Sequence, residues 1–329
     1  MNLYNRMMEE EFAYKLLENK DYIFLYADIK TDDKGEKRGK KVNNMLQPLH
    51  SFKVEYFNEG VTMERKIKEK FFVTQNNEKV MEFNSLRRAD MERFIGEIFS
   101  MGKILVIDFT LMNARFLGSF CAILNRFKWE EVYFCYTEPG TYNQNENKDY
   151  DLKNATMGYE QIPNLESTSI NSTICDWVIF LGFEENRLMK LEGEISGNRQ
   201  YTLPYMSIPA MKTEWHNIAM NTNRHFFELK IDDRESLEYV SAINPFETYH
   251  RLYEIKGNNN NRLVISPIGP KPVMLGCIMY VLENTDEMLL FDNPYQEGRN
   301  TNEYGKTHFY DLTSFVLNVI NERILPEDE

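Results

Sequence analysis

Short apolar runs alternate with amphipathic segments along the first half of the chain. The runs at 21–30, 103–110 and 130–139 have the length and the aromatic and β-branched content of buried strands. Between them, the segments 85–102 and 113–127 carry apolar residues at helical spacing. This order of strands and helices is typical of a doubly wound, mostly parallel α/β sheet.

The alternation stops at 140–173, a polar and asparagine-rich stretch that we predict to be a linker or a long surface loop. It resumes with a strand and a helix across 176–193. We then expect a strand at 225–233 and a helix over 233–257 that breaks near Asn244. A second α/β half therefore follows the first.

The length of the chain supports two halves. A chain of 329 residues exceeds what one hydrophobic core usually organises, and 42% of its residues are hydrophobic. We predict an N-terminal Rossmann-like domain over 1–165 and a C-terminal Rossmann-like domain over 166–329.

Two segments of equal length resemble each other. LVIDFTLMNARFLG at 105–118 and LVISPIGPKPVMLG at 263–276 both open with Leu-Val-Ile and close with Leu-Gly. Each is expected to form a strand, a turn and the start of a helix. The pattern predicts two Rossmann-like halves related by an internal repeat, although independent strand–helix segments can also produce such short apolar words.

The charge argues against nonspecific nucleic-acid binding. A formal net charge of −13 opposes the neutralisation of phosphates, which needs a concentrated excess of Lys and Arg. One basic segment, 34–41, is either a phosphate patch or a solvated loop that leads into a helix.

Cysteine and histidine are not arranged as metal ligands. The chain has no C-x-x-C and no H-E-x-x-H, so we expect neither a metal site nor a resident cofactor. The cysteines are expected to fill cores; they are Cys121, Cys135, Cys175 and Cys277.

Membrane and export signals are missing from the pattern. No apolar run approaches the roughly 20 residues that span a bilayer, and the N-terminal segment is acidic and amphipathic. We expect a cytoplasmic protein that does not associate with membranes.

The expected site residues follow from one rule about open α/β sheets. Ligands bind beyond the carboxyl ends of the strands, where glycines let a ligand approach and helix N-termini favour anions. The residues that this rule selects for ligand binding are Thr110, Asn113 and Arg115 in the first half, and Gly182, Glu184, Ser266, Gly269 and Lys271 in the second.

Two interpretations stay open at several of these positions. Lys271 and the helix start beside it either hold an anion, or the flanking prolines only set a tight helix entry. Asp108, at the end of a predicted strand, is either a catalytic carboxylate, a ribose acceptor or a turn and capping residue. Glu138 is the second candidate acid or base.

The segment SPIGPKPVMLG, 266–276, resembles a motif of the CRISPR-associated Rossmann-fold (CARF) superfamily and its fused relatives, the SAVED domains. Gly269 and Lys271 match the second glycine and the lysine of that motif, whereas Ile268 and Pro270 replace its first glycine and its threonine. The resemblance extends over roughly 174–295. It implies a sensor of cyclic oligonucleotides in a prokaryotic antiviral defence system.

We therefore expect a sensor or regulatory subunit that binds a small anionic, nucleotide-type ligand. Its effector activity would reside on a protein partner, and a homo-oligomer is compatible with this role. The alternatives are a nucleotide-processing hydrolase or transferase, with Asp108 or Glu138 as acid or base, and a ligand-free structural subunit of a defence complex. The enzyme is the second hypothesis and the structural subunit the third. A sensor is favoured over an enzyme, and no nucleophile elbow or phosphate loop occurs in the sequence.

Overall fold

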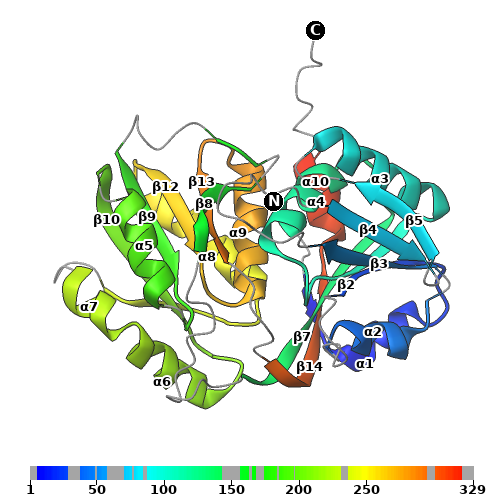
Figure 1. Ribbon diagram of the computed structural model, residues 1–329, viewed down its shortest axis with the longest axis horizontal. Coiled ribbons are helices and arrows are strands. Elements are labelled where there is room, and N and C mark those ends of the chain that lie inside the picture. Colours follow the sequence, from blue (N-terminus) through cyan, green and yellow to red (C-terminus); the bar gives the residue numbers. More distant parts are fainter. Residues whose placement is uncertain are drawn as a thin grey trace, which may run out of the picture. The chain divides into compact units, whose positions relative to one another are not determined.

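The chain forms two compact units, which are described separately. The computed structural model describes residues 6–28, 38–48, 50–57, 70–75, 78–83, 87–142, 156–162, 165–167, 174–183, 185–195, 197–230, 236–294 and 301–320. Unit 1 comprises Met1–Thr141 and Thr301–Glu329, and unit 2 comprises Tyr142–Asn300 (Figure 1).

Unit 1 is built on an eight-stranded sheet with the order β1-β14-β7-β6-β2-β3-β4-β5. Its strands are β1 (Arg6–Met8), β2 (Ile23–Asp28), β3 (His50–Phe57), β4 (Lys70–Gln75), β5 (Glu78–Phe83), β6 (Ile104–Asp108), β7 (Glu131–Tyr142) and β14 (Thr301–Asp311). Its helices are α1 (Glu10–Leu17), α2 (Arg38–Leu46), α3 (Arg88–Met101), α4 (Ala114–Leu124) and α10 (Thr313–Ile320). Helices α1 and α2 lie on one side of this sheet, and α3 and α4 lie on the other (Figure 1).

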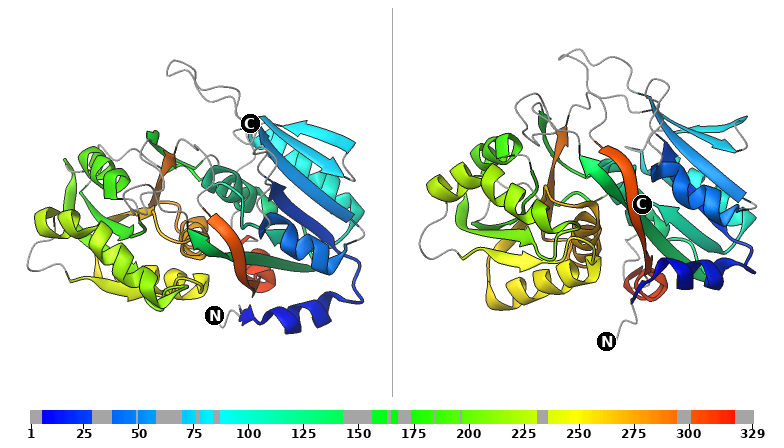
Figure 2. Two further views of the ribbon diagram at one scale, coloured as in Figure 1. Left: turned by 60° about the horizontal axis from the view of Figure 1, so that its bottom comes forward. Right: turned by 90° about the horizontal axis from the view of Figure 1, so that it is seen from below.

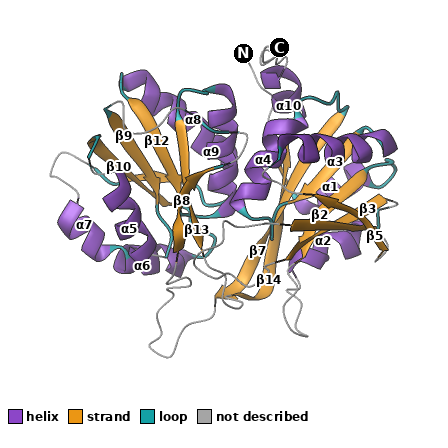
Figure 3. Ribbon diagram, turned by 45° about the horizontal axis from the view of Figure 1, so that its top comes forward, coloured by secondary structure: helices purple, strands orange, loops and turns teal. Residues whose placement is uncertain are grey.

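Unit 2 is built on a six-stranded sheet with the order β11-β10-β9-β12-β13-β8. Its strands are β8 (Thr156–Gln161), β9 (Cys175–Phe180), β10 (Arg199–Ser207), β11 (Glu238–Val240), β12 (Arg262–Pro267) and β13 (Met288–Pro294). Its helices are α5 (Glu185–Ile195), α6 (Thr213–Thr222), α7 (Arg224–Lys230), α8 (Pro245–Asn258) and α9 (Lys271–Glu283). Figure 3 shows purple helices packed against the orange strands of this sheet and of the unit 1 sheet.

Each sheet contains a set of four parallel strands in the same order, and in unit 2 a fifth parallel strand, β11, pairs with β10. In unit 1 the parallel set is β3-β2-β6-β7, and in unit 2 it is β10-β9-β12-β13. In each set the strand that comes first along the chain lies between the next two strands of the set. Thus β2 pairs with β3 and β6, and β9 pairs with β10 and β12. This order places a topological switch point between β2 and β6 and another between β9 and β12. The predicted α/β, Rossmann-like class is confirmed. Descent of the two halves from one repeat stays a prediction, because a shared strand order also arises independently.

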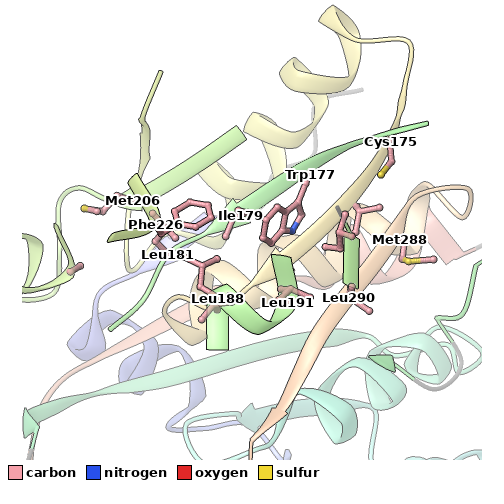
Figure 4. Packing of buried hydrophobic residues seen from close by; sticks show 14 residues of the cluster. Cys175, Trp177, Ile179, Leu181, Leu188, Leu191, Met206, Phe226, Met288 and Leu290 are labelled. Carbon is pink, nitrogen blue, oxygen red and sulfur yellow. The ribbon is translucent and has the colours of Figure 1, made fainter. Parts of the chain in front are cut away.

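The apolar periodicity identifies the helix faces correctly. The buried side chains of α3 are Met91, Phe94, Ile95 and Ile98, which recur at helical spacing. In unit 2, Trp177 and Ile179 of β9 point toward Leu188 and Leu191 of α5 and toward Phe226 of α7 (Figure 4). The predicted helices α3 and α5 therefore cover sheet faces as expected, and α7, which was predicted as a strand, covers the same face as α5.

The division between the units differs from the predicted boundary. The C-terminal strand β14 returns to unit 1, where it lies between β1 and β7 (Figure 2). The expected linker at 140–173 contains part of β7 and all of β8, which pairs antiparallel with β13. Both differences arise from strands whose pairing partners are far away in the sequence: β14 lies between β1 and β7, and β8 pairs with β13 at the edge of its sheet.

Two elements of the second half were assigned wrongly from the sequence. Residues 225–230 of the expected strand at 225–233 lie in helix α7, and the remainder lies outside the described residues. The Phe226 N–H of α7 donates to the Glu185 carboxylate (2.8 Å), and the Phe226 ring packs against Trp177. The predicted break near Asn244 is confirmed, since α8 begins at Pro245 and Asn244 caps it by accepting from the Phe246 N–H (3.1 Å), but the part before the break contains strand β11 instead of a helix. Tertiary contacts override local propensity at both places.

Gly276 allows α8 and α9 to pack closely. A Cβ at this position would lie 2.3 Å from the Pro245 carbonyl oxygen and 2.7 Å from the Thr248 Cβ. We expect Gly276→Ala to lower the free energy of unfolding by at least about 2 kcal/mol, measured by urea denaturation, because both neighbours are backbone or near-backbone atoms. A matched control is Gly257→Ala on α8, where nothing lies within 4 Å of the added methyl and a gain of about 0.5 kcal/mol is expected. Equal stability of the two variants would contradict the packing role of Gly276.

Candidate functional site

The two loops at the switch point of unit 2 touch each other through their backbones. A Cβ on Gly182, after β9, would lie 2.7 Å from the Ile268 carbonyl oxygen, and a Cβ on Gly269, after β12, would lie 3.0 Å from the Leu181 carbonyl oxygen. The structure thus brings these two predicted residues together. Their lack of side chains is explained by loop packing, which needs no ligand.

The β9 loop is also fixed from α6. The Asn223 side-chain amide donates to the Gly182 carbonyl oxygen and to the Ala219 carbonyl oxygen, both at 2.8 Å. Asn223 is buried, so these bonds are shielded from water. Glu184, which was predicted to bind ligand in this loop, lies outside the described residues.

Ser266 belongs to the core of unit 2. Its side chain is fully buried, and its hydroxyl accepts a hydrogen bond from the Trp177 indole N–H at 3.0 Å. A buried indole N–H needs such a partner. The sequence rule selected Ser266 for ligand binding, and the structure gives it a partner inside the protein instead.

Lys271 begins α9 at the carboxyl edge of the same sheet and is half-buried. Pro270 is the N-cap, and Pro272 follows in the first turn, so two of the residues at this helix start have no backbone N–H. The Met274 N–H closes the first turn on the Pro270 carbonyl oxygen (3.2 Å). The prolines therefore set the helix entry, as one interpretation predicted, and the Lys271 side chain adds a full positive charge there.

Lys212 is a second cation at this edge, and the sequence reasoning missed it. It is the N-cap residue of α6, and its Nζ lies 5.4 Å from the ring centroid of Trp215. Because β10, β9 and β12 are parallel, the helices that follow them begin at one edge of the sheet. Applying the same rule to the segment after the strand at 199–207 would have selected Lys212.

The equivalent edge of unit 1 is closed by internal hydrogen bonds. Asp108, at the end of β6, accepts from the Thr110 N–H (2.9 Å), and the Thr110 hydroxyl accepts from the Thr137 N–H (2.9 Å). All three side chains are buried. Asp108 thus has the turn-stabilising geometry that was one of its predicted roles.

Asn113 and Arg115 have structural settings in helix α4. Asn113 is the N-cap and accepts from the Phe116 N–H at 2.7 Å. Arg115 follows in the first turn and is buried.

The remaining candidate, Glu138 of β7, is hydrogen-bonded to His308 of β14, with 2.5 Å between Glu138 Oε1 and His308 Nε2. The sequence reasoning missed His308, because β14 itself was missed.

The cysteines are confirmed as buried core residues. All four are free and buried. Burial raises the pKa of the Cys121 thiol to about 12 and raises the pKa of the Cys135 thiol well above its ordinary value, and the nearby Asp108 adds to the second effect. Thiols with raised pKa values are poor nucleophiles at neutral pH.

These features define an α/β protein with two Rossmann-like units, one of which has two lysines at the carboxyl edge of its sheet. No family model, curated protein or solved structure matches the chain. Within the described ranges, no cluster of three or more His, Cys, Asp or Glu side chains is placed to hold a metal ion. Within the same ranges, no helix has the length and apolar character needed to cross a membrane.

The Trp177–Ser266 hydrogen bond predicts a measurable cost. Ser266→Ala leaves a buried indole N–H without its acceptor, so the free energy of unfolding should fall by about 1–3 kcal/mol, measured by urea denaturation with tryptophan fluorescence. Ser236→Ala, at an exposed position, should have no such effect. An unchanged stability in Ser266→Ala would argue against the core role of Ser266.

Proposed function

We propose that the protein binds a small anionic, nucleotide-type ligand at the carboxyl edge of the unit 2 sheet and acts as a sensor or regulatory subunit. The observation that carries this proposal is the pair of lysines, Lys212 and Lys271, at the starts of α6 and α9. Helix N-termini carry partial positive charge, and the two ammonium groups add to it at one edge of the sheet. This local positive charge is opposite in sign to the net charge of −13 on the whole chain.

Two features support a nucleotide over a simple anion. Phe183, in the loop after β9, is half-buried and packs edge-on against Trp215, with ring centroids 6.1 Å apart. The Trp215 ring in turn lies 5.4 Å from Lys212 Nζ, and aromatic rings near a cation suit a ligand that has both a base and a phosphate. The resemblance of 266–276 to the CARF and SAVED motif points to the same ligand class, and the antiviral role and the effector-bearing partner rest on that resemblance.

A binding role suits this edge better than catalysis. The Ser266 hydroxyl is turned into the core, and the Glu185 carboxylate caps α7 through the Phe226 N–H. Both groups therefore have structural partners instead of facing a substrate. A sensor needs only a ligand that binds two conformations with different affinities.

The proposal predicts stabilisation by nucleotides. In a panel of cyclic oligonucleotides, linear nucleotides and inorganic phosphate, one nucleotide class should raise the unfolding temperature, with about 2.7 kcal/mol of stabilisation at 100 times its Kd. Lys271→Ala and Lys212→Ala should each weaken binding at least about tenfold, in line with the loss of a charge-assisted contact. Lys190→Ala, on the exposed part of α5, is the matched control and should bind normally. A ligand response that is unchanged in both edge variants would refute this site.

The alternative, an enzyme that hydrolyses or transfers part of a nucleotide, has one observation in its favour. Glu138 and His308 form a close carboxylate–imidazole pair on neighbouring strands of unit 1. If this pair is catalytic, chromatography of the ligand after incubation will show turnover, and Glu138→Gln will reduce the rate at least about 100-fold. A ligand recovered intact supports the sensor.

A further inference from the structure

The carboxylate of Glu10 is held in unit 1 by donors from three elements. Lys41 Nζ of α2 lies 2.9 Å from Oε1 and 3.2 Å from Oε2, and the Thr307 N–H of β14 donates to Oε2 at 3.2 Å. The Tyr14 hydroxyl, one turn along α1, donates to Oε1 at 2.8 Å. An ammonium, a backbone N–H and a hydroxyl are the donor types that bind free carboxylates.

The groups that hold the Glu10 carboxylate, Lys41 and Thr307, form a cradle that belongs mostly to the core of unit 1. Lys41 Nζ also donates to the Thr307 hydroxyl (2.9 Å) and to the Gly305 carbonyl oxygen (3.2 Å), so its position does not depend on Glu10 alone. Its side chain is only 11% exposed. A cation at this depth needs a nearby anion, because the surrounding protein solvates it less well than water does.

The anion comes from a small peripheral element. Helix α1 has 8 residues, too few for a stable helix without tertiary contacts, and its buried side chains are Ala13 and Leu17. Strand β1 before it has 3 residues and pairs at the edge of the sheet. The carboxylate is thus supplied from a short segment at the edge of the sheet, whereas Thr307 lies on β14, between β1 and β7.

The cradle is continuous with the carboxyl edge of the sheet. The Thr307 hydroxyl hydrogen-bonds to the Thr137 hydroxyl at 3.0 Å, and the Thr137 N–H continues to Thr110 at the end of β6. Ligands of α/β proteins bind at this edge. Tyr304, which is 48% exposed, has its ring centroid 5.5 Å from Lys41 Nζ and provides an accessible aromatic surface beside the charge.

We propose that Lys41 and Thr307 form an anion-binding site in which Glu10 stands in for the carboxylate of a small organic acid. When such an acid binds, it replaces Glu10, and the β1–α1 segment loses its polar anchor to α2 and β14. Burial raises the pKa of the Glu10 carboxyl, but the hydrogen bonds from Lys41, Tyr14 and Thr307 outweigh this effect and lower it, so that Glu10 is charged at neutral pH. The site is separate from the unit 2 edge and does not depend on the nucleotide proposal.

The first test removes the Glu10 carboxylate by the substitution Glu10→Ala, which leaves a space that acetate can fill. The variant should unfold about 4 °C below the wild type, and acetate should recover most of this loss when compared with chloride at equal ionic strength. Glu11→Ala, at an exposed position in the same turn, should behave as the wild type. The double variant Glu10→Ala with Lys41→Met should show no acetate response. A missing response in Glu10→Ala, or an equal response in the double variant, overturns the proposal.

The second test measures displacement in the wild type. Hydrogen exchange at the amides of α1 should become faster as acetate is added, and Glu10→Gln should show fast exchange without it. Exchange that does not change with acetate overturns the stand-in role of Glu10. A larger effect of inorganic phosphate than of acetate, in either test, overturns the assignment of the ligand as a carboxylate.

Discussion

The burial of the parallel strands at the centre of each sheet is the constraint on which the rest of the structure depends. The central strands of both units are fully enclosed, as Leu25, Val106, Val178 and Val264 show. Parallel neighbours cannot be joined by a tight turn, so the chain returns through a crossover helix each time. Every such helix begins at the carboxyl edge of its sheet. Helix dipoles, loop glycines and polar side chains are therefore gathered at that edge by topology, before any ligand is considered.

The polar groups at the carboxyl edge of the sheet have different surroundings in the two units. In unit 1 the strand ends are joined by hydrogen bonds within the protein, from Asp108 through Thr110 and Thr137 to Thr307. In unit 2 the loops after β9 and β12 meet at Gly182 and Gly269. The lysines Lys212 and Lys271 of unit 2 lie at the starts of α6 and α9. One scaffold thus gives a closed polar network in the first unit and an edge that carries lysines in the second.

The elements that were predictable are those whose burial is visible in a short stretch of sequence. The strand–helix–strand units at β6–α4–β7 and β12–α9–β13 have continuous apolar strands, so their pattern does not depend on distant partners. Strand β14 is different, because Thr307 and His308 are polar residues that become buried only between β1 and β7. Helix α7 depends in the same way on Glu185 and Trp177.

The candidate sites were predictable only in part, for the same reason. A rule about strand ends selected Lys271 and the glycines, because these residues follow their strands directly. It could not find the contact between Lys41 and Thr307, which are 266 residues apart and meet only when β14 joins the sheet of unit 1. The partner of a buried charge is set by the tertiary fold, whereas the edge on which a loop lies is set by the order of strands and helices.

The burial of a lysine determines how strongly its charge needs an anion nearby. Lys41 is shielded to the point where its charge needs an anion in the folded state, whichever molecule supplies it. Glu10 fulfils this requirement with side-chain atoms that are 24% exposed, so water and solutes reach the pair from one side. An external anion at unit 1 must therefore compete with a carboxylate that is already tethered to the chain, which raises the affinity that such a ligand needs.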